Sequence, residues 1–280
     1  MRATVCVIVI LLVGPTAGTE AIAAQKAPEA RAPYSVSGAT TVTLAPRPDV
    51  AYRLYVAVPP DYAAVTTTYP VVYLADGDWY FALGVTIARL LEAAGELPPM
   101  IIVGIGYGGT VTSQRQRRWR DFTPAAEKTL PNSGHAGAFL GDLRDAIIPY
   151  VESQYRVSGD RAFVGHSLGG LFGLHVMMRE PRLFGRTVIG DPALWPAGGA
   201  FWAEEEAFRR TSTFRGRMFV ALSDLDGRRD PGEIQKLSKM LGSHASADFA
   251  WVTRTLPDTS HQSSVAALLA AGLRWVFPKP

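Results

Sequence analysis

Residues 165–170 have the clearest chemical signature in the chain, with the sequence Gly-His-Ser-Leu-Gly-Gly. A short, mostly apolar run at residues 161–164 precedes this segment, and residues 171–178 follow it. This order predicts a buried strand, a sharp turn and a helix. A serine at the tip of such a turn is exposed for nucleophilic attack, and the positions on either side must be small because the strand and helix approach closely. We therefore predict that Ser167 is a nucleophile. In any other context the pattern would indicate only a glycine-rich turn with a solvated serine.

A serine nucleophile needs a general base to accept its proton. When the serine lies in a strand–turn–helix segment, the acid follows it in the chain and the histidine comes last, on a loop after the final strand. His261 lies in such a loop, at residues 257–261, and is our candidate base. The other four histidines lie beside the nucleophile, on expected helices or in a polar turn: His135, His166, His175 and His244.

Three aspartates could orient the base and stabilise its imidazolium form. Asp224 and Asp226 follow an expected strand at residues 218–222, and we favour Asp226. Asp191 follows the preceding strand and is a further alternative. Each could instead be a turn aspartate that caps its own backbone.

An oxyanion hole requires two backbone N–H donors. One donor is expected at the residue after the nucleophile, Leu168. The other is expected from the turn after an early strand, where Gly77 and Asp78 are the candidates.

The elements that must position these residues alternate between strand and helix, which indicates a mostly parallel sheet flanked by helices on both faces. Residues 36–44 and 52–58 resemble an opening hairpin. Further strands are expected at 71–74, 100–105, 184–189, 218–222 and 248–256. Helices are expected at 81–94, 134–155 with an interruption near Pro149, 200–210, 231–241 and 263–276.

Residues 106–134 show little periodicity, and a loop of this length in a compact domain is usually functional. Four arginines surround Trp119 in this stretch, which indicates a site for an anionic or aromatic ligand. The alternative is a solvated basic loop. The arginines are Arg115, Arg117, Arg118 and Arg120.

Composition places the protein among globular, exported chains. Residues 1–24 have the basic start, apolar run and Ala-x-Ala site of a cleavable signal peptide, followed by a disordered lead-in at 25–33 and one domain at 34–280. Cys6 is the only cysteine, so the processed chain has neither a disulfide nor a thiol nucleophile. A net charge of +3 does not indicate nucleic acid binding, and we expect no membrane contact after cleavage. The expected location is the periplasm or outside the cell.

Four segments resemble the Putative esterase family of α/β-hydrolases, which includes enterochelin-type siderophore esterases and other exported esterases. They are residues 69–78, 118–124, 165–174 and 192–195. The resemblance implies the α/β-hydrolase fold and is strongest to periplasmic siderophore trilactone hydrolases. It also implies that Arg120, or less directly Arg118, binds a catecholate ligand. The chain departs from the usual Ser-Pro-Ser-Leu-Trp-Trp segment of the family, with Asp191 in place of a serine and Pro196 in place of a tryptophan.

These observations predict an exported serine carboxylic ester hydrolase that acts through an acyl-enzyme, with siderophore esters as the leading substrate class. Trp119, His166 and Trp195 are further candidate substrate contacts. The chemistry needs neither a cofactor nor a metal, and the expected partner is a small-molecule ester. The alternatives are a general carboxylesterase, an acyltransferase acting on another bulky ester, and a non-catalytic ligand-binding protein with the same fold.

Overall fold

The computed structural model describes residues 35–196, 200–225 and 231–279. The expected signal peptide at 1–24 and lead-in at 25–33 lie outside the described residues, as does Asp226. Within the described part of the chain, no helix is both long enough and apolar enough to cross a membrane.

The centre of the fold is an eight-stranded sheet with the order β1-β2-β4-β3-β5-β6-β7-β8. The first two strands form the expected antiparallel hairpin, and β2 also pairs antiparallel with β4. The remaining neighbours are parallel, which confirms the mostly parallel sheet. The strands are β1 (Ala39–Arg47), β2 (Val50–Ala57), β3 (Tyr69–Leu74), β4 (Ile101–Gly106), β5 (Val157–His166), β6 (Arg186–Gly190), β7 (Gly216–Ser223) and β8 (Phe249–Leu256).

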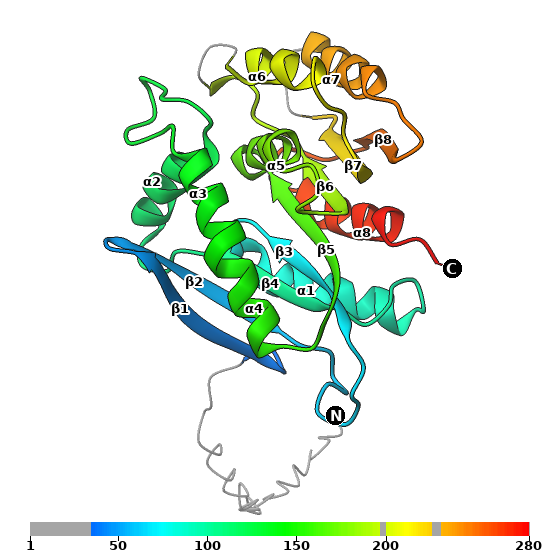
Figure 1. Ribbon diagram of the computed structural model, residues 1–280. Coiled ribbons are helices and arrows are strands. Elements are labelled where there is room, and N and C mark those ends of the chain that lie inside the picture. Colours follow the sequence, from blue (N-terminus) through cyan, green and yellow to red (C-terminus); the bar gives the residue numbers. More distant parts are fainter. Residues whose placement is uncertain (1–34, 197–199, 226–230, 280) are drawn as a thin grey trace, which may run out of the picture. The chain divides into compact units, whose positions relative to one another are not determined.

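Helices cover both faces of this sheet and enclose two hydrophobic cores (Figure 1). One core lies against α1 (Gly77–Ala93) and α8 (Ser264–Val276). The other includes side chains from the remaining helices. Those helices are α2 (Val111–Phe122), α3 (Ala136–Asp142), α4 (Ile148–Gln154), α5 (Leu168–Arg179), α6 (Ala200–Arg209) and α7 (Pro231–Ser243). The α/β-hydrolase fold expected from the sequence is therefore confirmed.

The expectation of an irregular stretch at residues 106–134 is wrong in part, because α2 occupies its centre. This helix is capped by Thr110, whose Oγ1 accepts a hydrogen bond from the Ser113 amide at 3.2 Å. Only Asp121 and Phe122 are buried on it. A polar helix that buries so little has no apolar stripe, so hydrophobic periodicity could not reveal it.

The expected helix at residues 134–155 is also irregular, but the irregularity lies before the proline. A π-helical turn at Leu143–Ile147 separates α3 from α4. Pro149 is at the start of α4 and has no N–H to donate to the carbonyl of Asp145, four residues earlier. The widened turn therefore lies where the ordinary helical hydrogen bond cannot form.

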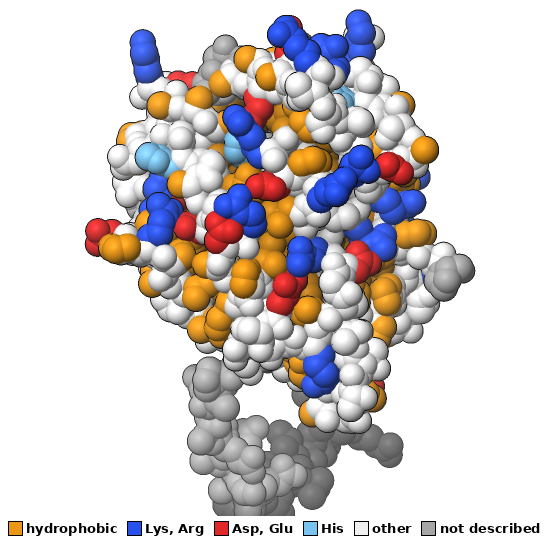
Figure 2. Space-filling view, in the orientation of Figure 1, with side chains coloured by type: hydrophobic (Ala, Val, Ile, Leu, Met, Phe, Trp, Pro, Cys, Tyr) orange, Lys and Arg blue, Asp and Glu red, His pale blue; other side chains and the backbone are white. Residues whose placement is uncertain are grey.

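Charged side chains on the face shown in Figure 2 are dispersed, with acidic and basic groups close to one another. Ion pairs among the described residues include those of Arg144 with Asp145 and Glu180, at 2.6 and 2.7 Å. This distribution agrees with the small net charge of +3.

The packing of α8 on the sheet predicts that Gly272→Ala destabilises the protein. A Cβ at this glycine would lie 2.4 Å from Val188 Cγ1, so the helix or strand must shift, at a cost of about 1–3 kcal/mol. The matched control is Gly141→Ala, because a Cβ there meets no atom within 4 Å. The free energy of unfolding of the control should rise by about 0.5–1 kcal/mol, because alanine favours a helix more than glycine does. Urea unfolding of both variants checks this, and equal stabilities would contradict the packing.

Candidate active site

Ser167 lies in the sharp turn between β5 and α5. Its backbone has φ 59° and ψ −119°, a strained conformation for a residue with a side chain. A Cβ at Gly165 would lie 2.1 Å from the carbonyl oxygen of Gly169, so the strand and helix meet as closely as the glycine pattern requires. The Ser167 side chain is half-buried and remains reachable from solvent.

Three titratable side chains from separate segments meet beside this turn. They are His166 at the end of β5, Asp191 directly after β6, and His261 in the loop before α8. Asp191 Oδ2 lies 3.5 Å from His166 Nε2 and 4.0 Å from His261 Nδ1. The two imidazole rings pack against each other with centroids 4.6 Å apart. The structure therefore brings the candidate base to the serine turn.

The carboxylate of Asp191 is buried and held in a fixed position. Its Oδ1 accepts hydrogen bonds from the Ser223 amide at 2.7 Å and the Ser223 hydroxyl at 3.1 Å. Its Oδ2 accepts one from the Ser264 hydroxyl at 2.8 Å. These donors satisfy a buried charge that would otherwise be costly, and they leave Oδ2 facing both histidines.

Asp224, the second candidate acid, is directed elsewhere. Its two carboxylate oxygens accept hydrogen bonds from the backbone amides of Asp258 and Thr259, both at 2.9 Å. These bonds lower the pKa of Asp224 below its ordinary value. Asp224 thus fastens the loop that carries His261.

Among the described aspartates proposed from sequence, Asp191 is the one that approaches His261. Asp226, which we favoured from sequence, lies outside the described residues. The sequence did not reveal the hydrogen bonds that Ser223 and Ser264 donate to Asp191. These serines lie on other elements and are not part of a recognisable motif.

The oxyanion candidates lie at the starts of two helices. Leu168 is the first residue of α5 and Gly77 the first of α1, where backbone N–H groups have no partner inside the helix. A Cβ at Gly77 would lie 2.6 Å from the Gly104 carbonyl carbon, so this turn also needs glycine. The side chain of Asp78 accepts hydrogen bonds from the amides of Tyr107 and Gly108 at 2.6 and 2.9 Å, which fastens α1 to the segment that follows β4.

Arg118 connects the serine turn with the turn that precedes α1. Its Nε donates to Asp76 Oδ1 at 2.7 Å, and its Nη2 donates to the carbonyl oxygen of His166 at 3.3 Å. The guanidinium also lies 5.4 Å from the ring centroid of Trp79. Because the side chain is only 11% exposed, Arg118 is placed to position the site. Asp76 was not singled out from the sequence, since its partner is distant in the chain.

The other predicted substrate contacts are arranged differently. Arg120 forms a two-point ion pair with the buried carboxylate of Asp121, at 2.7 and 2.9 Å. Trp119 is half-buried against the core. Trp195, four residues after Asp191, is 57% exposed and available to a ligand.

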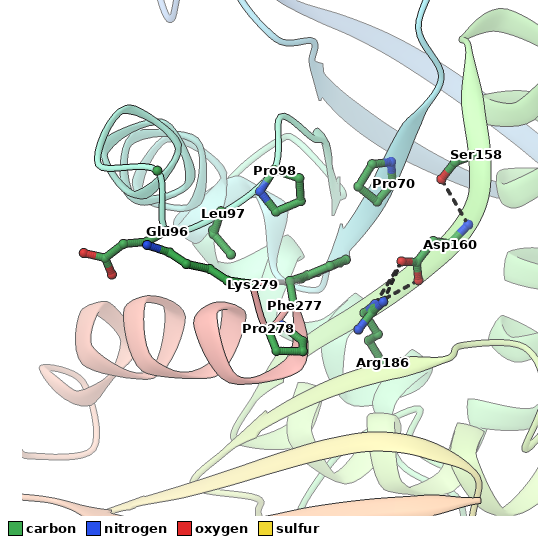
Figure 3. Close-up of a pocket in the computed structure, with 11 residues that line it drawn as sticks. Pro70, Glu96, Leu97, Pro98, Ser158, Asp160, Arg186, Phe277, Pro278 and Lys279 are labelled. Atoms are coloured by element: carbon green, nitrogen blue, oxygen red, sulfur yellow. Dashed lines mark hydrogen bonds and ion pairs between the residues drawn. The ribbon is translucent and has the colours of Figure 1, made fainter.

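A cavity of about 440 Å³ lies at the opposite end of the sheet from Ser167. Figure 3 shows Asp160 of β5 paired with Arg186 of β6 on its wall, near Pro70 of β3 and Phe277 of the chain end. These residues are at the amino ends of their strands, whereas parallel α/β sheets bind ligands at the carboxyl ends. We therefore place the candidate site at the serine turn.

The geometry at the turn can be compared with known families. Residues 46–226 match the model of the family described as Putative esterase, which is more than half of the chain. The chain belongs to this family. The resemblance inferred from the sequence motifs is therefore confirmed.

Several proteins that are similar in sequence are esterases by name. The chain is 34% identical over 143 residues to the ferri-bacillibactin esterase BesA of Bacillus subtilis, covering 45% of this chain and 48% of BesA. It is 32% identical over 139 residues to the siderophore enterobactin esterase of Emericella nidulans, covering 44% and 46%. The matches thus span about half the length of these two relatives.

Solved structures show the same fold over most of the chain. The BES protein of Bacillus cereus superimposes with a TM-score of 0.79 at 24% identity, covering 88% of this chain and 97% of that one. An IroE-like serine hydrolase from Shewanella oneidensis gives 0.76 at 24% identity, covering 85% and 80%.

The bonds from Asp224 predict that Asp224→Asn loosens the loop that carries His261. Amide hydrogen exchange at Asp258 and Thr259 should become faster than in the wild type, because a neutral amide accepts hydrogen bonds less strongly than a carboxylate. The lowered pKa of Asp224 also gives the direction of the pH dependence. The stabilisation that the Asp224 carboxylate gives to the loop is complete above its unfolded-state pKa, and it is lost as pH falls through its lower folded-state pKa. Unchanged exchange at both amides would contradict this role.

Proposed function

We propose that the protein is a serine carboxylic ester hydrolase with Ser167 as nucleophile and His261 as general base. The observation that carries the proposal is that His261 and the buried carboxylate of Asp191, from two other segments, lie beside a turn whose serine has strained backbone geometry. Membership in the esterase family supports the same reaction class.

The reaction follows from this arrangement. His261 accepts the proton of Ser167 as the hydroxyl oxygen attacks the ester carbonyl, and Asp191 holds the imidazole tautomer and stabilises its charged form. The backbone N–H of Leu168, with Gly77 or Asp78, stabilises the developing oxyanion. The proton then passes to the leaving alcohol, and water releases the acyl group by the same steps in reverse.

We propose siderophore esters as the substrate class. Relatives that are over 30% identical across nearly half of the chain are named for ferri-bacillibactin and enterobactin ester cleavage. An exposed Trp195 near Asp191 offers an aromatic surface to such a ligand. Arg118 and Arg120 are both paired to buried carboxylates, so we assign ligand contact to the exposed rim of the site and not to these two arginines.

A hydrolysis panel tests the enzyme class and the substrate separately. Short p-nitrophenyl esters and a catecholate trilactone, free and ferric, are offered to the wild type and to Ser167→Ala. We expect the trilactone to be cleaved faster than the simple esters, and the variant to lose about 10³-fold or more in kcat because acyl transfer requires the nucleophile. Cleavage of simple esters alone would overturn the substrate assignment. Full activity in the variant would overturn Ser167.

Substitution of the two described aspartates separates their roles. Asp191→Asn should lower kcat by about 10³–10⁴-fold, because the amide cannot stabilise the imidazolium and favours the wrong tautomer. Asp224→Asn should lower kcat far less, since it only loosens the loop. Comparable losses, or a larger loss at Asp224, would contradict this assignment.

We also propose that the protein is exported after removal of residues 1–23 or 1–24. The intact mass of protein recovered from a bacterial periplasm or medium should match a chain that begins at Ala24 or Gln25. Recovery of the full chain from the cytoplasm alone would contradict export.

A further inference from the structure

The residues beside the serine turn also have the composition of a metal site. Within residues 35–196, 200–225 and 231–279, His166, Asp191 and His261 are the three residues whose ligand atoms all lie within 4.8 Å of one another. One carboxylate oxygen, Asp191 Oδ2, lies 3.5 Å from the first imidazole and 4.0 Å from the second. Two ligands of a tetrahedral zinc ion are about 3.4 Å apart. Small side-chain movements would therefore complete the coordination.

The carboxylate is held in the manner of a supported metal ligand. Ser223 donates two hydrogen bonds to Asp191 Oδ1, at 2.7 and 3.1 Å, and so directs Oδ2 toward the histidines. Hydrogen bonds of this kind orient the side chains that bind a metal and raise the affinity for it. Both His166 and Asp191 are buried, whereas the His261 side chain is 18% exposed and gives access from solvent.

We propose that His166, Asp191 and His261 bind one divalent transition-metal ion of the Zn²⁺ class, and that the bound ion switches off ester hydrolysis. The inhibitory half of this statement rests on the proposed function, whereas the binding half does not. Two imidazoles and one carboxylate suit zinc and its neighbours in the first transition row. Magnesium and calcium prefer more oxygen ligands and are excluded by this donor set.

Inhibition follows from the ring nitrogen of His261 to which the metal binds. An ion bound to His261 Nδ1 leaves the remaining ring proton on Nε2, so the ring can no longer accept the proton of Ser167. The ion also takes the carboxylate that would stabilise the imidazolium. Chelation with EDTA removes the ion and returns the ring to its catalytic tautomer.

Binding is measured directly with Co²⁺, whose visible absorption reports tetrahedral coordination. Untagged full-length protein carrying Ser167→Ala is titrated, because its ligand set is intact and no turnover occurs. We expect one equivalent to bind and zinc to displace it. Adding His166→Gln or His261→Gln to this protein should abolish the signal. His135→Gln is the matched control, because it removes an exposed histidine outside this cluster and should leave the signal unchanged.

Inhibition is measured with Zn²⁺ on the otherwise wild-type enzyme. The concentration for half inhibition should rise at least about tenfold in His166→Gln, relative to that variant's own metal-free rate, because one ligand is lost. EDTA should restore activity, and Mg²⁺ and Ca²⁺ should have no effect. Circular dichroism confirms that each variant is folded. His261→Gln is used in the cobalt titration alone, because the proposed general base is needed for hydrolysis.

The outcomes separate the two claims. Absence of cobalt coordination, or a signal that persists in both His166→Gln and His261→Gln, overturns the metal site. Coordination without zinc inhibition overturns the switch. If the protein hydrolyses no ester, the proposed function fails, and the cobalt titration still decides whether the site binds metal.

Discussion

The buried carboxylate of Asp191 is the constraint on which the site depends. A charge in this position is stable only when its oxygens are supplied with donors. The donors come from β7, through Ser223, and from the start of α8, through Ser264. The end of β6, the end of β7, α8 and the serine turn must therefore meet at one point. The same requirement draws His166 and His261 to within 4.6 Å, centroid to centroid.

The site also depends on close backbone packing between strands and helices. Gly165 lets β5 pass against the first turn of α5, and Gly77 lets α1 start against β4. The two helix starts that could stabilise an oxyanion are in this way brought to one edge of the sheet. Arg118 then joins them, because its guanidinium contacts both Asp76 and the backbone of His166. A buried ion pair of this kind is worth more as a positioning device than as a source of stability.

The sequence predicted those features that depend on neighbouring residues. The strand, turn and helix around Ser167 follow from local apolar runs and glycines, and the parallel sheet follows from their alternation. Helix α2 was missed because it buries only Asp121 and Phe122. Side-chain hydrogen bonds between distant parts of the chain could not be predicted from the sequence. Asp191 and its partner Ser264 are 73 residues apart, and Arg118 and its partner Asp76 are 42 residues apart. The choice between Asp191 and Asp224 therefore required the fold, whereas Asp226 lies outside the described residues.

The most direct test of the account is covalent trapping of the serine by a fluorophosphonate, followed by peptide mass spectrometry. The reagent reacts far faster with a serine activated by a neighbouring base than with other serines. The account predicts one phosphonyl group on Ser167, with labelling that slows greatly in Asp191→Asn and only slightly in Asp224→Asn. Labelling at another serine, or an unchanged rate in Asp191→Asn, would contradict the central claim that the buried aspartate and His261 activate Ser167.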